Sequence, residues 1–201
     1  RDAMENERKT DRSADMGMDE HRLSDILLAS QIKATDIYET PPQIIWIDNS
    51  TIATLGNFSA STGKAKSKKT FNVSALVAAS LAGKQVLNYR AHLPEGKQRI
   101  LYVDTEQSRF HCRSVLERIL RLAGLPTTTD PENLDFFCLR EYSPSVRIEV
   151  IDYALRQQKG YGLVIIDGIR DLMLDINNAG ESVEVINRMM EWSSRYDLHI
   201  H

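Results

Sequence analysis

Short apolar runs and longer helical periodicities alternate along most of the chain. The runs, bounded by Gly, Pro, Asn or Asp, predict strands, and apolar residues three and four positions apart predict helices. The expected strands are 44–48, 51–55, 58–62, 86–90, 99–106, 134–140, 161–168 and a last one from 198, and the expected helices are 23–34, 71–83, 110–123, 146–160 and 181–196. This order predicts an α/β fold with a mostly parallel sheet and helices on both faces.

Two pairs of these strands have the spacing of hairpins. Asn49 and Ser50 separate 44–48 from 51–55, and a turn at 94–96 leads from 86–90 back into 99–106. Four of the five residues 100–104 are apolar, which predicts a central strand that is covered on both faces.

Composition limits the class of protein. With 42% apolar and 26% charged residues the chain is close to the globular average, which excludes a disordered, collagen-like or coiled-coil chain. The net charge of −3 provides no global attraction to nucleic acid, so such a contact must be local. No apolar run reaches the roughly 20 residues of a membrane span, and no signal-peptide core opens the chain. We therefore expect a cytoplasmic protein without a membrane partner.

The domain organisation follows from the same pattern. We expect residues 1–22 to be a flexible tail and residues 23–201 to be one domain, incomplete at its C-terminus because the chain stops inside an expected strand. The two cysteines, Cys112 and Cys138, have no metal-ligand spacing and are interpreted as reduced thiols.

The most informative motif is the string GKAKSKKT at 63–70. It matches the phosphate-loop pattern G-x-x-x-x-G-K-[ST] at Gly63, Lys69 and Thr70, whereas Lys68 replaces the second glycine. Such a loop places backbone N–H groups and a helix N-terminus around phosphate oxygens. The expected nucleotide contacts are Gly63, Lys64, Ala65, Lys66, Ser67, Lys68, Lys69, Thr70 and Phe71. The alternative is a solvated basic loop that happens to contain Gly and Lys-Thr.

Two expected strands end in carboxylates. Asp167 ends the apolar string VIID at 164–167, and Asp104 and Glu106 lie in the string ILYVDTEQ at 100–107. Ligands bind at the carboxyl ends of the strands in open α/β sheets, so an aspartate there can hold Mg²⁺ and a glutamate can polarise a water molecule. Strand alternation predicts Asp104 and Glu106 on the same side. The alternatives are a helix-capping or turn residue for Asp167 and solvated loop acids for the other two.

The order of these motifs resembles the RecA-type P-loop ATPases. A phosphate loop, a strand ending in DTE at 104–106 and a later strand in VIIDGIRDL are similar to that family. The resemblance implies that Lys69 and Thr70 bind ATP and Mg²⁺, that Asp167 assists the metal, and that Glu106 activates water, so that Glu106 and Lys69 are catalytic. It also implies subunits that share active sites, and therefore a homo-oligomer.

The segment 167–201 resembles the RepA-like branch of plasmid helicases and the transposon-borne ATPase-like proteins of Bacteroides-type bacteria, whose loops can read GKAKS-[KR]-KT. This similarity implies an ATPase that acts on single-stranded DNA for a mobile genetic element. Lys68 favours an alternative, a nucleotide-binding accessory factor without turnover. A small-molecule or nucleotide kinase is a third class, but no candidate for an arginine-rich lid is present. His199 and His201 could suggest a metal pair or be ordinary strand residues.

Overall fold

The computed structural model describes residues 19–62, 69–175 and 177–201, which fall in two compact units divided between Thr40 and Pro41. The first unit holds helix α2 (Glu20–Ser30), which is capped by the side chain of Asp19 and has no buried residue. The sequence predicts this helix at 23–34, so the helix begins and ends earlier than expected. Among the described residues, no helix is long and apolar enough to cross a membrane.

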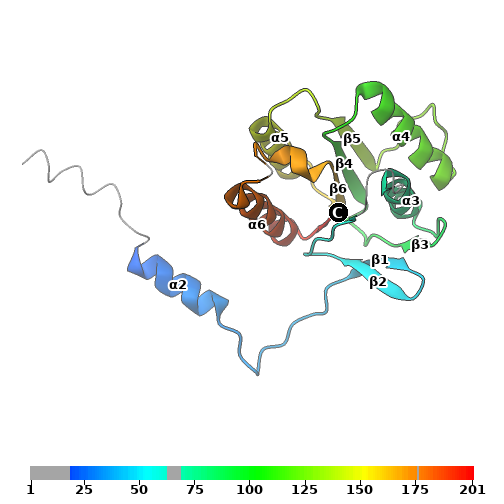
Figure 1. The fold of residues 1–201 in the computed structure, drawn as a ribbon. Coiled ribbons are helices and arrows are strands. Elements are labelled where there is room, and N and C mark those ends of the chain that lie inside the picture. Colours follow the sequence, from blue (N-terminus) through cyan, green and yellow to red (C-terminus); the bar gives the residue numbers. More distant parts are fainter. Residues whose placement is uncertain (1–18, 63–68, 176) are drawn as a thin grey trace, which may run out of the picture. The chain divides into compact units, whose positions relative to one another are not determined.

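The second unit is built on a parallel sheet that helices cover on both faces (Figure 1). The sheet has the order β5-β4-β6-β7. Its strands are β4 (Arg99–Asp104), β5 (Leu134–Cys138), β6 (Tyr161–Asp167) and β7 (His199–Ile200). The helices are α3 (Lys69–Ala82), α4 (Arg109–Ala123), α5 (Pro144–Gln157) and α6 (Ala179–Arg195). The predicted α/β fold is confirmed.

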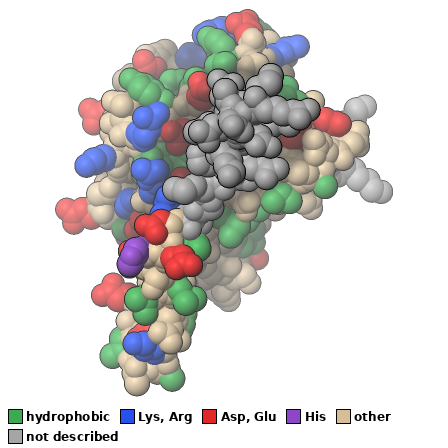
Figure 2. Space-filling view, turned by 90° about the vertical axis from the view of Figure 1, so that its left-hand side faces the viewer, with side chains coloured by type: hydrophobic (Ala, Val, Ile, Leu, Met, Phe, Trp, Pro, Cys, Tyr) green, Lys and Arg blue, Asp and Glu red, His purple; other side chains and the backbone are tan. Residues whose placement is uncertain are grey.

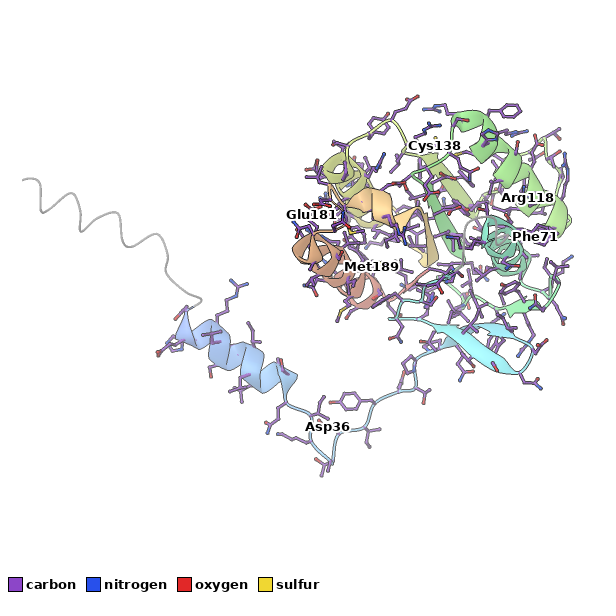
Figure 3. The ribbon with its side chains drawn as sticks, in the orientation of Figure 1. Asp36, Phe71, Arg118, Cys138, Glu181 and Met189 are labelled. Atoms are coloured by element: carbon purple, nitrogen blue, oxygen red, sulfur yellow. The ribbon has the colours of Figure 1, made fainter. Side chains whose placement is uncertain are left out.

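Strand β4 is buried on both faces because its side chains alternate between two cores. Ile100 and Tyr102 belong to the core that contains α3 and α4, whereas Leu101 and Val103 belong to the core that contains α5 and α6. Met189 of α6, labelled in Figure 3, contributes to the second core. Two apolar faces on one strand are satisfied only at the centre of a covered sheet, as the sequence predicts.

A second, antiparallel sheet contains β1 (Gln43–Ile47), β2 (Ser50–Thr54) and β3 (Tyr89–Ala91) in the order β2-β1-β3. The hairpin between β1 and β2 is confirmed. The predicted pairing of 86–90 with 99–106 is wrong, because β3 pairs with β1 and β4 lies in the parallel sheet. The turn residues at 94–96 predict a change of chain direction, but they do not predict with which strand β3 pairs. With one buried face, β3 fits the edge of the small sheet.

The helix ends follow from local side-chain chemistry. The Ser143 hydroxyl accepts the N–H of Val146, and Pro144 occupies the first turn of α5. Asn178 accepts N–H groups at the start of α6, whose Glu181 carboxylate (Figure 3) accepts two more from the preceding loop. Gly124 ends α4 in the left-handed conformation, with φ of 76°.

The segment before the phosphate loop lies beside β7. The Ser59 N–H donates to the Ile200 carbonyl at 2.9 Å, and the Ile200 N–H donates to the Asn57 carbonyl at 3.2 Å. Phe58 forms a single parallel bridge with Ile200 and is 40% exposed. The buried strand predicted at 58–62 is therefore wrong for the residues that the structure describes, because this segment is attached at an edge and is not covered on both faces.

Candidate active site

The carboxyl ends of β4 and β6 meet at one edge of the parallel sheet. The two strands are neighbours, and their register places Asp104 beside Asp167. Glu106 follows β4, and Asp171 lies in the short 3₁₀-helix η1 (Ile169–Leu172) that follows β6. Parallel strands therefore bring together four carboxylates from two segments that are far apart in sequence.

Asp167 is half-buried and held by an aromatic hydroxyl. The Tyr102 hydroxyl donates to Asp167 Oδ2 at 2.9 Å. Burial raises the pKa of Asp167. The hydrogen bond from Tyr102 and the positive charge of Lys69 lower this pKa, whereas the charge of Asp104 raises it.

Asp104 is fully buried and belongs to the turn after β4. Its Oδ1 accepts the backbone N–H groups of Glu106 at 3.0 Å and Gln107 at 2.8 Å, and its Oδ2 accepts the Gln107 side-chain amide at 2.8 Å. A buried carboxylate requires such partners. The alternative of a solvated loop acid is wrong for Asp104, whose three hydrogen bonds fix the direction of the backbone at Glu106.

Glu106 is exposed at the same edge. Partial burial raises its pKa, the charges of Asp171, Asp167 and Asp104 raise it further, and Lys69 lowers it. Because β4 ends at Asp104, strand alternation does not extend to Glu106. The two carboxylates therefore occupy different environments, and only Glu106 is open to water.

Thr105 and Gly168 are two residues of the edge that sequence reasoning missed. The Thr105 hydroxyl lies 2.8 Å from the Gly168 carbonyl and 3.1 Å from Asp171 Oδ2. Gly168 has φ of 104°, and a Cβ there would lie 2.2 Å from Thr105 Oγ1 and 2.7 Å from Glu106 Cγ. A glycine directly after the strand-end aspartate was the only signal in the sequence for this close approach.

The nucleotide contacts expected at Gly63, Lys64, Ala65, Lys66, Ser67 and Lys68 lie outside the described residues. Lys69 and Thr70 form the first turn of α3, where Lys69 is exposed and Thr70 half-buried, and Phe71 (Figure 3) is 40% exposed. This first turn holds no acidic residue, so the positive end of the helix dipole and the Lys69 ammonium are both available to an anion.

The residues present fit a magnesium nucleotide. A hydroxyl at Thr70 and a carboxylate at Asp167 are the oxygen ligands that Mg²⁺ prefers, and Lys69 supplies a cation for phosphate oxygens. Among residues 19–62, 69–175 and 177–201, no group of three or more His, Cys, Asp or Glu side chains could hold a metal ion. Mg²⁺ is usually bound by one or two carboxylates together with substrate phosphates and water.

His199 and His201 do not form a metal pair, because their ring nitrogens are used within the protein. His199 Nδ1 donates to the Thr54 carbonyl at 2.9 Å, and Ser59 Oγ lies 2.8 Å from His199 Nε2 and 2.7 Å from His201 Nδ1. Burial lowers the pKa of both histidines, to about 4 for His199.

The low pKa of His199 predicts a loss of stability in acid. The unfolded chain binds a proton near pH 6.5 and the folded protein only near pH 4, so this contribution is complete above pH 6.5 and is lost as the pH falls towards 4. Between pH 7 and pH 4 the free energy of unfolding should fall by about 3 kcal/mol from this group. Urea unfolding of the wild type and of His199→Asn across this range measures it. Equal pH slopes in the two proteins would contradict it.

Comparison with known proteins supplies the family. A family model described as an AAA domain matches residues 23–201. No curated protein matches the chain. The match spans the phosphate-loop string, both carboxylate-ending strands and the covered parallel sheet described above. The chain therefore belongs to the AAA domain family, and is an ATP-binding protein of the P-loop ATPase class.

Proposed function

We propose that this protein hydrolyses ATP, with Glu106 as the general base. The observation that carries the proposal is that β4 and β6 pair with Asp104 beside Asp167, and that the turn fixed by Asp104 leaves Glu106 exposed at the same edge of the sheet. Lys69 and Thr70 would hold the phosphates and, with Asp167, the Mg²⁺ ion. When bound, this ion supplies charge neutralisation at the phosphate oxygens.

The chemical step follows from the exposure of Glu106. A water oxygen attacks the γ-phosphorus, the bond from that phosphorus to the oxygen bridging it to ADP breaks, and the Glu106 carboxylate accepts the proton of the water. Partial burial and then the neighbouring acids raise the pKa of Glu106, which makes this carboxylate a stronger base than an isolated glutamate. Asp104 accepts the backbone N–H of Glu106 and so stabilises the turn that contains Glu106.

Binding of a fluorescent ATP analogue tests the nucleotide site. Lys69→Ala removes the ammonium group at the start of α3 and should weaken Mg²⁺-dependent binding by roughly 10- to 100-fold, the value of a charge-assisted hydrogen bond. Lys159→Ala is the matched control, because Lys159 is exposed and precedes β6 at the opposite edge of the sheet. Equal affinity of the two variants would overturn the assignment of Lys69.

We further propose that hydrolysis is coupled to single-stranded DNA in a homo-oligomer, as in RepA-like proteins of mobile elements. On the side drawn in Figure 2, Lys and Arg side chains are interspersed with Asp and Glu side chains, so a DNA contact there would be local. Turnover measured with and without single-stranded DNA, at protein concentrations that span assembly, tests this coupling. A turnover rate that neither DNA nor concentration changes would contradict it.

The second candidate function is a nucleotide-binding accessory factor without turnover. Lys68 at the second glycine position of the loop favours it. Single-turnover assays with excess protein separate the two functions. ADP formation that disappears in Glu106→Gln supports the hydrolase, whereas tight binding without ADP supports the accessory factor.

A further inference from the structure

Four side chains form a continuous hydrogen-bonded chain between the segment before the phosphate loop and the sheet. Ser61 Oγ lies 2.7 Å from His201 Nε2, and His201 Nδ1 lies 2.7 Å from Ser59 Oγ. Ser59 Oγ lies 2.8 Å from His199 Nε2, and His199 Nδ1 lies 2.9 Å from the Thr54 carbonyl oxygen. The chain therefore runs without a break from Ser61 to the end of β2.

The position of every proton in this hydrogen-bonded chain follows from the Thr54 carbonyl oxygen at its end. A carbonyl oxygen only accepts, so His199 Nδ1 carries a hydrogen and, in the neutral ring, Nε2 accepts the Ser59 proton. Ser59 has then used its one proton, so its oxygen accepts from His201 Nδ1. His201 Nε2 accepts the Ser61 hydroxyl in turn. Both rings are neutral, and both carry their hydrogen on Nδ1.

The surroundings offer no partner for a charged ring. His199 is 1% exposed, and its neighbour across β6 is the apolar Leu163. Asp197, in the turn before β7, and Asp167, at the end of β6, are not hydrogen-bonded to either imidazole. The same holds for Glu181, Glu184 and Glu191 of α6, the helix that packs against β7. Burial lowers the pKa of His199, and a positive charge on His201 would lower it further.

The hydrogen bonds of Ser59 and Ser61 to the two histidines help to hold residues 57–61 to the sheet. Three backbone hydrogen bonds join this segment to β7 and to the residue before β7: from Gly56 N to Leu198 O, from Ser59 N to Ile200 O and from Ile200 N to Asn57 O. The histidine chain adds bonds from Ser59 and Ser61, and Ser61 lies two positions before the first glycine of the phosphate loop. These side-chain bonds thus extend the attachment towards the loop.

We propose that His199 and His201 are positioning residues for the nucleotide site, which as neutral rings clamp residues 57–61 to β7 and so fix where the chain enters the phosphate loop. This proposal rests on the proposed nucleotide site. Protonation of His199 Nε2 would turn this nitrogen from an acceptor into a donor, so the Ser59 hydroxyl could no longer donate to it. The hydrogen-bond directions of this chain therefore require the neutral ring.

Nitrogen NMR of the imidazole rings tests the chain directly, without nucleotide. At pH 7.5 His199 and His201 should both have a protonated Nδ1 and an unprotonated Nε2. The exposed His92 of the same protein serves as the internal reference. A proton on Nε2 of either ring, or a charged ring at this pH, would overturn the proposed chain.

Removal of one hydroxyl tests the positioning role. Ser59→Ala takes away the partner of both rings and should weaken binding of the Mg²⁺–ATP analogue about tenfold, the value of one to two ordinary hydrogen bonds. Ser194→Ala is the matched control, because Ser194 is an exposed serine of α6 that lies outside this hydrogen-bonded chain, so its effect should be small. Ser59→Thr keeps the hydroxyl and should restore affinity.

The outcomes separate this proposal from the proposed function. If the wild type binds the analogue and Ser59→Ala binds it equally well, the positioning role is wrong and the nucleotide site stands. If the wild type binds no analogue, the proposed function fails and the positioning role fails with it. The NMR result then still decides whether the clamp exists, and faster amide exchange at Ile200 in Ser59→Ala would confirm it.

Discussion

Replacing Glu106 with Gln is expected to lower the steady-state rate of ATP hydrolysis by about 10²–10⁴-fold, the usual contribution of a general base. The amide keeps the size of the side chain but cannot accept a proton from water. Binding of the Mg²⁺–ATP analogue should stay within about threefold of the wild type, because the interactions assigned to the ground state involve Lys69, Thr70 and Asp167. Phosphate release and analogue binding, measured on the same samples, give the two values.

The pH profile adds a second readout for Glu106. The base acts only when it is ionised, and its pKa is raised by partial burial and by the nearby acids. The wild-type rate should therefore fall on the acid side at a higher pH than for an isolated glutamate, and the residual rate of Glu106→Gln should lack this limb. Glu95→Gln, an exposed residue in the turn before β4, is the control. Equal losses in both variants would rule out a specific role for Glu106.

Replacing Gly168 with Ala is expected to destabilise the protein by about 2–5 kcal/mol, the sum of backbone strain and overpacking. The residue has φ of 104°, where a side chain is strained, and its Cβ would lie 2.2 Å from Thr105 Oγ1. Relief of this contact requires β4 and β6 to separate at their carboxyl ends or the Thr105 hydroxyl to leave the Gly168 carbonyl. Urea unfolding monitored by circular dichroism measures the change.

A second glycine separates the two contributions. Gly96 also has a positive φ, of 75°, but nothing lies within 4 Å of its Cβ position. Gly96→Ala should therefore cost only about 1–2 kcal/mol, the backbone part alone. If Gly168→Ala cost no more than this, the close approach of Thr105 and Gly168 would not exist in solution. Nucleotide affinity of the folded fraction of Gly168→Ala should also fall, because Asp167 is the preceding residue.

The fold could be predicted where the residue pattern of a single segment determines how that segment must be buried. The two apolar faces of β4 require a central position, and the small residues around α3 require burial on most sides; eight consecutive residues, 73–80, are indeed buried. The partner of β3 could not be predicted, because its three residues fit the edge of either sheet. The same holds for residues 57–61, whose attachment depends on His199 and His201, about 140 positions away.

The candidate site shows a similar division. Parallel strands bring their carboxyl ends to one edge whatever the details, so Glu106 and Asp167 could be placed together from the sequence. The different environments of Asp104 and Glu106 could not, because the two residue types carry the same charge two positions apart. The backbone N–H groups of Glu106 and Gln107 donate to Asp104. This contact buries Asp104 in the turn and leaves Glu106 open to water.

The pairing of residues 57–59 with β7 has a consequence for synthesis on the ribosome. Ser59 and His199 are 140 positions apart. At about 5–20 residues per second, roughly 7–28 s pass between the emergence of the two. During that time residues 57–59 lack their β7 partner, although β4, β5 and β6 can already assemble. The nascent chain thus attaches the segment before the GKAKSKKT string only after β7 has emerged.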